Sequence, residues 1–211
     1  MKRFLLLLPL LVASHSTLAE QIEVEYKRFY SHVSKIGDES TSALQFAFGF
    51  MHVRNKALCH INSATIVTQK VDLPLAVSPE QRFLVPKEKA LKLADAAIVI
   101  DLDEPANLCD MSVQLETTAE YVKKQYSSAE LALIKAQYDT FFDDMGGFLS
   151  FMMPAVSGLK IQFADKSLNQ TLAGAPPIIN GTLILDNDWL EQGNALDLPA
   201  APLRITAVAE D

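Results

Sequence analysis

The chain has 211 residues, of which 49% are hydrophobic, and a formal net charge of −8. This apolar fraction is sufficient for a folded core and argues against a disordered chain. The acidic balance argues against nucleic acid and anionic lipid as partners, and it leaves a protein or a neutral small ligand as the partner to expect.

The first 19 residues have the layout of a secretory signal peptide. Lys2 and Arg3 give a positive start, residues 4–13 are continuously apolar, and Thr17 and Ala19 place small residues before a cleavage point. We expect removal after Ala19, which leaves residues 20–211 as the mature region in the periplasm. The apolar run is too short to cross a ~30 Å bilayer core, and no later stretch reaches the ~18 residues of a membrane-spanning helix. We therefore expect no transmembrane anchor.

The mature region begins with a strand and a helix, and its clearest strand follows at 44–50. Alternation predicts a strand at 22–26, and the spacing of apolar residues predicts a short helix at 26–33. One face of 44–50 is large and apolar, which predicts a strand with a buried aromatic face: Leu44, Phe46, Phe48 and Phe50. The opposite face is small or polar: Gln45, Ala47 and Gly49.

Strand and turn patterns continue to residue 116. Strands are predicted at 64–68, 71–77, 82–85, 97–103 and 109–116, and a helix of about two turns is predicted at 87–94. Pro74 cannot donate a hydrogen bond to a neighbouring strand, so 71–77 is expected at a sheet edge.

Cys59 and Cys109 are the only cysteines. An even count in an exported chain favours a disulfide between them. Alternation in 109–116 directs Cys109 toward the face of Met111, Val113 and Leu115, which we expect to be buried. The bridge would close a loop of about 50 residues and contribute up to ~4 kcal/mol through chain entropy. Two free buried thiols are the alternative.

A single amphipathic helix is predicted at 128–146. Ser128 is the expected N-cap, and Glu130 complements the helix dipole in the first turn. One apolar stripe follows at spacings of three and four residues: Leu131, Ile134, Tyr138, Phe141 and Met145.

The last third returns to strands, at 159–163, 182–185 and 203–208, with an Asn-Gly turn at 180–181 that favours a hairpin. The fold class is therefore α+β with mostly antiparallel strands. The mature region is either one unit or two similar β-rich halves, 20–126 and 157–211, joined by helix 128–146. The order of elements in 64–103 is repeated in 159–208, which favours a duplication. Because sequence identity is nearly absent, chance similarity is the alternative.

The sequence contains no recognisable catalytic motif, so the catalytic residues are unknown at this level. The mature region has three histidines, His32, His52 and His60, but no nucleophile elbow, phosphate-binding loop or dinucleotide fingerprint. His60 beside Cys59 suggests a metal site, yet paired ligands at short spacing are missing and oxidation would consume both thiols. Residues 186–188 lack the rest of a calcium-binding loop and are expected to cap a short helix. We expect no metal and no cofactor.

The remaining candidate is an apolar run after the predicted helix. It contains a patch rich in phenylalanine and methionine: Phe148, Leu149, Phe151, Met152 and Met153. Methionine-rich surfaces adapt to varied partners, so an exposed patch would mark a binding site. Packing in the core is the alternative, and this composition favours it.

Three segments, LQFAFGF at 44–50, LCDMSVQLE at 108–116 and GGFLSFMMP at 146–154, resemble a family of exported proteins from Gram-negative bacteria known only as a domain of unknown function. The resemblance implies a periplasmic address but no activity, ligand or site residues. We expect a soluble periplasmic binding or envelope-interaction module rather than an enzyme. The alternatives are a hydrolase whose site combines sequence-distant residues, and a periplasmic chaperone or assembly factor with an open strand edge.

Overall fold

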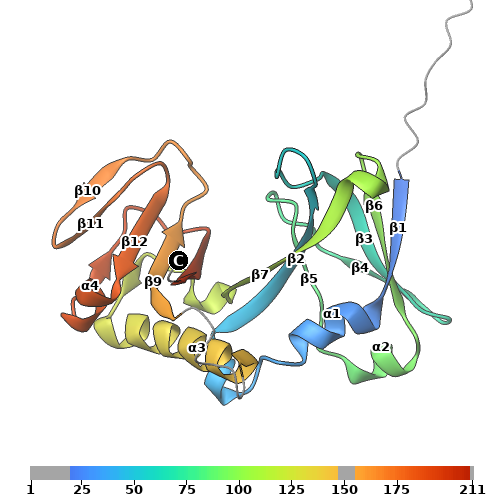
Figure 1. Ribbon diagram of the computed structural model, residues 1–211, viewed down its shortest axis with the longest axis horizontal. Coiled ribbons are helices and arrows are strands. Elements are labelled where there is room, and N and C mark those ends of the chain that lie inside the picture. The colour runs from blue at the N-terminus through green and yellow to red at the C-terminus, as the bar shows by residue number, and fades with distance from the viewer. Residues whose placement is uncertain (1–19, 147–154, 210–211) are drawn as a thin grey trace, which may run out of the picture.

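A computed structural model describes residues 20–146 and 155–209 of the chain (Figure 1). Its helices and antiparallel strands confirm the predicted α+β class. The predicted signal peptide and the apolar patch from Phe148 to Met153 lie outside the described residues. Within the described part of the chain, no helix combines the length and hydropathy needed to cross a membrane.

The first half of the chain builds two antiparallel sheets (Figure 1). One sheet has four strands, in the order β1 (Glu20–Glu25), β6 (Ala97–Leu102), β3 (Ile61–Val67) and β4 (Asp72–Leu75). The other has three, in the order β5 (Phe83–Leu84), β2 (Leu44–His52) and β7 (Cys109–Thr117). The short helix α2 (Lys89–Leu93) leads into β6. Pro74 lies in the edge strand β4, as its missing amide donor predicts.

The aromatic face of β2 forms the core of this half, as predicted. Helix α1 (Tyr26–Val33) packs against it, with the ring centroid of Phe29 5.0 Å from that of Phe48 and 5.9 Å from that of Phe83. The predicted burial of β7 is wrong in part, because Met111 is 38% exposed although Cys109 is buried. Since β7 is the outer strand of its sheet, less of this face is covered.

The second half builds a sheet in which β9 (Val156–Gln162) lies between β12 (Thr182–Asp186) and β14 (Arg204–Ala209) (Figure 1). Two smaller antiparallel pairs accompany it: β10 (Gln170–Leu172) with β11 (Ala175–Ile178), and β8 (Gln125–Tyr126) with β13 (Leu196–Asp197). The short helix α4 (Asn187–Glu191) follows β12.

The predicted turn at Asn180 and Gly181 is confirmed. Both residues have positive φ, +50° and +69°, as a type I′ turn requires. Ile179 and Thr182 exchange two backbone hydrogen bonds of 2.8 and 3.0 Å across it. The hairpin ends at this pair, because β12 forms its ladder with β9 and not with β11.

Helix α3 (Ser128–Gly146) follows β8 in the chain and is hydrogen-bonded both to β14 and to the residue before β2 (Figure 1). The hydroxyl of Tyr138 donates a 2.8 Å hydrogen bond to the carbonyl of Ile205 in β14. On the other side, the Oε1 atom of Gln137 accepts a 2.6 Å hydrogen bond from the amide of Ala43, directly before β2. The helix therefore holds β2 and β14 in fixed relative positions.

Two details of the predicted helix are wrong. The cap is Ser127 and not Ser128: the amide of Glu130 donates to the Ser127 hydroxyl, and the amide of Ser127 donates to the Glu130 carboxylate, which together form a capping box. The buried stripe ends at Phe141, because Met145 is 44% exposed and lies beyond the part of the helix that the core covers.

The strand pairing of the two predicted repeats agrees only in part. In both halves the first and last strands of the repeated pattern are antiparallel neighbours, β3 with β6 and β9 with β14. The middle strands differ, because β12 pairs with β9 whereas β5 pairs with β2. The duplication and the division into halves therefore stay predictions.

Candidate functional site

The small, polar face of β2 is the floor of the candidate site. Cross-strand partners in a sheet point to the same side. The register between β2 and β7 therefore extends this face with polar side chains, pairing Gln45 with Glu116, Ala47 with Gln114, and Gly49 with Ser112. A polar surface thus lies on the reverse of the aromatic core.

The loop before β5 packs onto this floor at Gly49. A Cβ atom there would lie 2.7 Å from the carbonyl oxygen of Gln81, so only glycine permits the observed approach. The loop is closed by backbone hydrogen bonds from Ser78 to Arg82 (2.7 Å) and from Gln81 to Ser78 (2.9 Å). Gln81 has a φ of +60°. This conformation places the Arg82 side chain on the polar floor.

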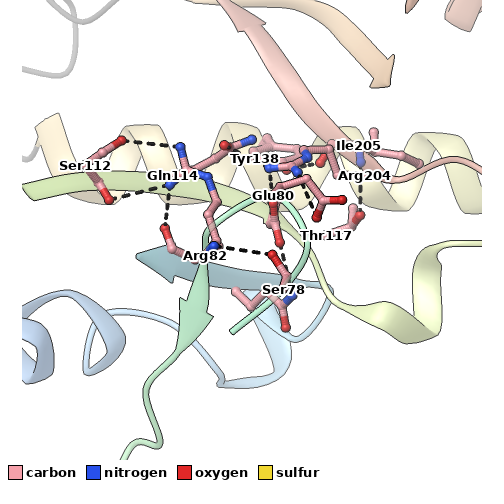
Figure 2. Close-up of polar contacts among 12 residues, drawn as sticks. Ser78, Glu80, Arg82, Ser112, Gln114, Thr117, Tyr138, Arg204 and Ile205 are labelled. Atoms are coloured by element: carbon pink, nitrogen blue, oxygen red, sulfur yellow. Dashed lines mark hydrogen bonds and ion pairs between the residues drawn. The ribbon is translucent and has the colours of Figure 1, made fainter. Parts of the chain in front are cut away.

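Arg82 is buried without a carboxylate partner (Figure 2). Only 8% of the residue is exposed, and its guanidinium donates to the carbonyls of Ala47 (3.3 Å) and Ser112 (3.5 Å) and to the Ser112 hydroxyl (3.3 Å). Among the described residues, its Nε has no hydrogen-bond partner, and no carboxylate oxygen lies within 4 Å of the guanidinium. Burial lowers the pKa of Arg82, the nearby charge of Arg204 lowers it further, and the charge of Glu116 opposes this to a smaller extent.

Arg204 approaches the same floor from the second half, at the start of β14 (Figure 2). Its Nη1 donates to Gln114 (3.0 Å) and forms an ion pair with Glu116 (3.2 Å), and its Nη2 lies 3.6 Å from a carboxylate oxygen of Glu80. Ile205, the next residue, is hydrogen-bonded to both β7 and α3. Its amide donates to the Thr117 hydroxyl in β7, and its carbonyl accepts from the Tyr138 hydroxyl in α3.

Glu116 is the titratable group at the centre of this network. Burial raises the pKa of its carboxyl above 4.5, and the Glu80 carboxylate raises it as well. The positive charge of Arg204, a hydrogen bond from Gln45 and the charge of Arg82 oppose this rise. The raised pKa means that Glu116 is protonated, and the local charge becomes more positive, at a higher pH than for an ordinary glutamate carboxyl.

Two cavities flank the arginines. The first, here named the arginine pocket, has a volume of about 460 Å³ and lies between the polar floor and the turn at residues 180–181. The second, the sheet-face pocket, has a volume of about 260 Å³ and lies between β2, β5 and the loop before β5. Four residues line both: Glu80, Arg82, Leu203 and Arg204.

The arginine pocket is positive although the whole chain is acidic. Its charged lining residues are Arg82, Lys166, Arg204 and Glu80, a formal balance of +2 in a chain of net charge −8. Guanidinium groups bind carboxylates and phosphates through paired hydrogen bonds, and a partly enclosed site strengthens this attraction. The arrangement is therefore suited to binding an anion.

The disulfide between Cys59 and Cys109 is present, with the two Cα atoms 6.4 Å apart, which confirms the predicted bridge. Glu104 offers a carboxylate oxygen within 4.8 Å of both sulfur atoms, and these three residues form the one candidate metal cluster among the described residues. Because both thiols are consumed by the bridge, no thiolate is left to bind a metal.

The histidines lie apart from the arginine pocket. His60 is 3.0 Å from Asp103, and both side chains are more than half exposed. His32 packs its ring against Phe46 and Phe48 at centroid distances of 5.5 and 5.9 Å. Within residues 20–146 and 155–209, no serine hydroxyl is hydrogen-bonded to a histidine ring.

The acidic turn at 186–188 caps a helix, as expected. The carboxylate of Asp186 accepts a 2.8 Å hydrogen bond from the amide of Trp189 in α4.

The residues that form the arginine pocket were not predicted from the sequence. The available signal was an arginine at each of two predicted strand starts, Arg82 and Arg204, and a polar face in two strands that are otherwise apolar.

Comparisons with known proteins identify a family but no described relative. The family model "Protein of unknown function (DUF2987)" matches residues 18–163, which is more than half of the chain and includes Arg82 and Glu116. Searches of curated proteins and of solved structures gave no match. The expectation of a family known only as a domain of unknown function is thus confirmed, and the chain belongs to the DUF2987 family.

Proposed function

We propose that this protein is an exported, non-catalytic binding module whose ligand is a small anion held in the arginine pocket. The observation that carries the proposal is Arg82, a buried arginine that faces two cavities without a carboxylate partner among the described residues.

The energetics of Arg82 favour an external counter-charge. Burying a charge is unfavourable unless it is paired, and Arg82 makes only hydrogen bonds of 3.3–3.5 Å to neutral oxygens. The carboxylates of Glu80 and Glu116 are engaged by Arg204. An anion in the arginine pocket would supply the missing partner and also attract the exposed Lys166.

The sequence supports export to the periplasm. Residues 1–19 have the order of a signal peptide, and the disulfide is typical of an oxidising compartment. The net charge alone favours a neutral or protein ligand, but a ligand responds to the local field, which is positive here.

Anion binding by the exported protein, purified from the periplasm, tests the proposal. Nuclear magnetic resonance titration with acetate and with inorganic phosphate, at constant ionic strength, is expected to shift the amide signals around the arginine pocket, with a Kd of roughly 1 mM for these small probes. Lys166→Met should weaken binding several-fold. The matched control is Lys70→Met, an exposed lysine in a distant turn, which should leave binding unchanged.

The outcome can contradict the proposal in two ways. Binding that is equal for acetate and for neutral acetamide would show that charge is not recognised. Equal loss in the Lys166 and Lys70 variants would show that the effect is not local. Arg82→Gln gives a second test if its fold, checked by circular dichroism, is retained, and it should abolish binding.

A further inference from the structure

A third cavity, here named the edge pocket, opens beside the site described above. It has a volume of about 200 Å³ and lies where β5 ends. Six apolar residues line this pocket: Val33, Ile36, Leu44, Phe46, Leu84 and Val85. They come from α1 and the segment after it, from β2, and from β5 and the residue after it. Because β5 pairs with β2 only at Ala47 and Phe48, the start of β2 is left uncovered on this side.

The side chains that line the edge pocket are mostly apolar. Its one cation is Lys87, whose ammonium group already donates a 2.6 Å hydrogen bond to the carbonyl of Ile36. Leu84 is 48% exposed on the rim, where a large apolar side chain gains by being covered. The side chains of this lining suit an apolar chain.

The three cavities are neighbours through shared lining residues, and together they are here called the row. The edge pocket shares Gln45 and Leu84 with the sheet-face pocket, and the sheet-face pocket shares Arg82 and Arg204 with the arginine pocket. Along this row the lining changes from apolar, through a mixed section floored by Ala47, to cationic.

We infer that the ligand is a single anionic amphiphile, such as a medium-chain or long-chain carboxylate. This inference rests on the proposed function. The charged group is held by Arg82, Arg204 and Lys166, and the acyl chain passes Leu84 into the edge pocket. An individual amphiphile fits better than a membrane surface, since the net charge of −8 opposes binding to anionic bilayers.

Calorimetric titration of the exported protein with acetate, hexanoate and dodecanoate, all below micelle formation, tests the inference. If the chain is buried, affinity should rise about fourfold for each methylene added, until the pocket is filled. Dodecanol, which lacks the charge, should bind at least tenfold more weakly than dodecanoate. An acidic peptide and neutral vesicles loaded with dodecanoate serve as competitors.

A substitution of Leu84, at the rim of the edge pocket, tests the binding of the acyl chain separately from the binding of the charge. Leu84→Ser should weaken dodecanoate binding about tenfold and leave acetate binding unchanged, because Leu84 lines the edge and sheet-face pockets but not the arginine pocket. Leu93→Ser is the matched control, since Leu93 is 73% exposed on α2 and does not line the row. Circular dichroism confirms that both variants fold.

The failures of the two proposals are distinguishable. Acetate binding that does not strengthen with chain length would overturn the amphiphile and leave the anion site intact. Absence of binding by every anion, or dodecanol binding as tightly as dodecanoate, would overturn the proposed function itself. Tighter binding of the acidic peptide, or binding to vesicles without extraction of dodecanoate, would also contradict a single amphiphile as the ligand.

Discussion

Gly49→Ala is the sharpest test of how the arginine pocket is built. The new Cβ atom would lie 2.7 Å from the Gln81 carbonyl oxygen, whereas ordinary contacts begin at 3.4 Å. The loop before β5 must therefore retreat by about 0.7 Å, and Arg82, whose Cγ would lie 3.4 Å from the same Cβ atom, must move with it. Overpacking of this kind destabilises a fold by about 1–3 kcal/mol.

The same retreat should weaken the ligand site. The hydrogen bonds of Arg82 to Ala47 and Ser112 measure 3.3–3.5 Å, so an added 0.7 Å places all of them beyond hydrogen-bonding distance. A misplaced guanidinium should lower the affinity for acetate or dodecanoate roughly tenfold, about 1.4 kcal/mol. Urea unfolding gives the change in stability, and calorimetry gives the change in affinity.

Gly174→Ala is the matched control for this experiment. Gly174 has a φ of +71°, so alanine is strained there, but its Cβ atom would meet nothing within 4 Å. The control should lose about 1 kcal/mol of stability and keep its anion affinity. If Gly49→Ala changed neither quantity, or if both variants lost affinity equally, the role assigned to Gly49 would be refuted.

Three further predictions concern stability and pH. Replacing Cys59 and Cys109 by serine removes a disulfide between residues 50 positions apart and should lower the free energy of unfolding by up to about 4 kcal/mol. A loss below 1 kcal/mol in urea titration would contradict the chain-entropy reasoning. Ser127→Ala should destabilise α3 by about 0.5–2 kcal/mol. A hydrogen bond from the Lys123 ammonium, together with the capping box, lowers the pKa of Glu130 to about 2. The stabilisation by Glu130 is therefore complete above pH 4.5 and is lost as the pH falls toward 2, a dependence that Glu130→Gln should abolish in acid titrations followed by circular dichroism. Glu116 has a raised pKa, so its contribution to stability is greatest below pH 4.5 and is lost as the pH rises through that higher pKa. Its protonation on acidification should also tighten sulfate binding roughly tenfold; a similar pH dependence in Glu116→Gln would contradict this.

Local patterns of the sequence were sufficient for most elements but not for the site. Period-two alternation predicted β2 and its buried face, because that signal is contained in seven consecutive residues. Helical spacing predicted α3, yet it could not show that the core covers the helix only as far as Phe141 and leaves Met145 exposed, since this limit depends on what packs against the helix.

The arginine pocket depends on contacts that no local pattern contains. Arg82 and Arg204 are 122 positions apart, and each was seen only as the polar start of an apolar strand. Their meeting requires β14 to lie beside β7, and the approach of the loop requires a glycine at one position of β2. Besides the two arginines, the polar face of β2 and β7 was the visible trace of the site, because strands covered on both faces are usually apolar on both.

The charged residues of the arginine and sheet-face pockets also restrict the charge that the ligand can carry. The arginine and sheet-face pockets together contain three cations, Arg82, Lys166 and Arg204, and two carboxylates, Glu80 and Glu116. One singly charged anion would neutralise this set at neutral pH, whereas a doubly charged anion would be matched only after Glu116 is protonated. Because Arg82 belongs to the first half and Lys166 and Arg204 belong to the second, the bound anion would also link the halves. A carboxylate amphiphile should therefore raise the stability of the whole fold in proportion to the logarithm of its concentration, and sulfate, which stays doubly charged on acidification, should do so most strongly where Glu116 is protonated.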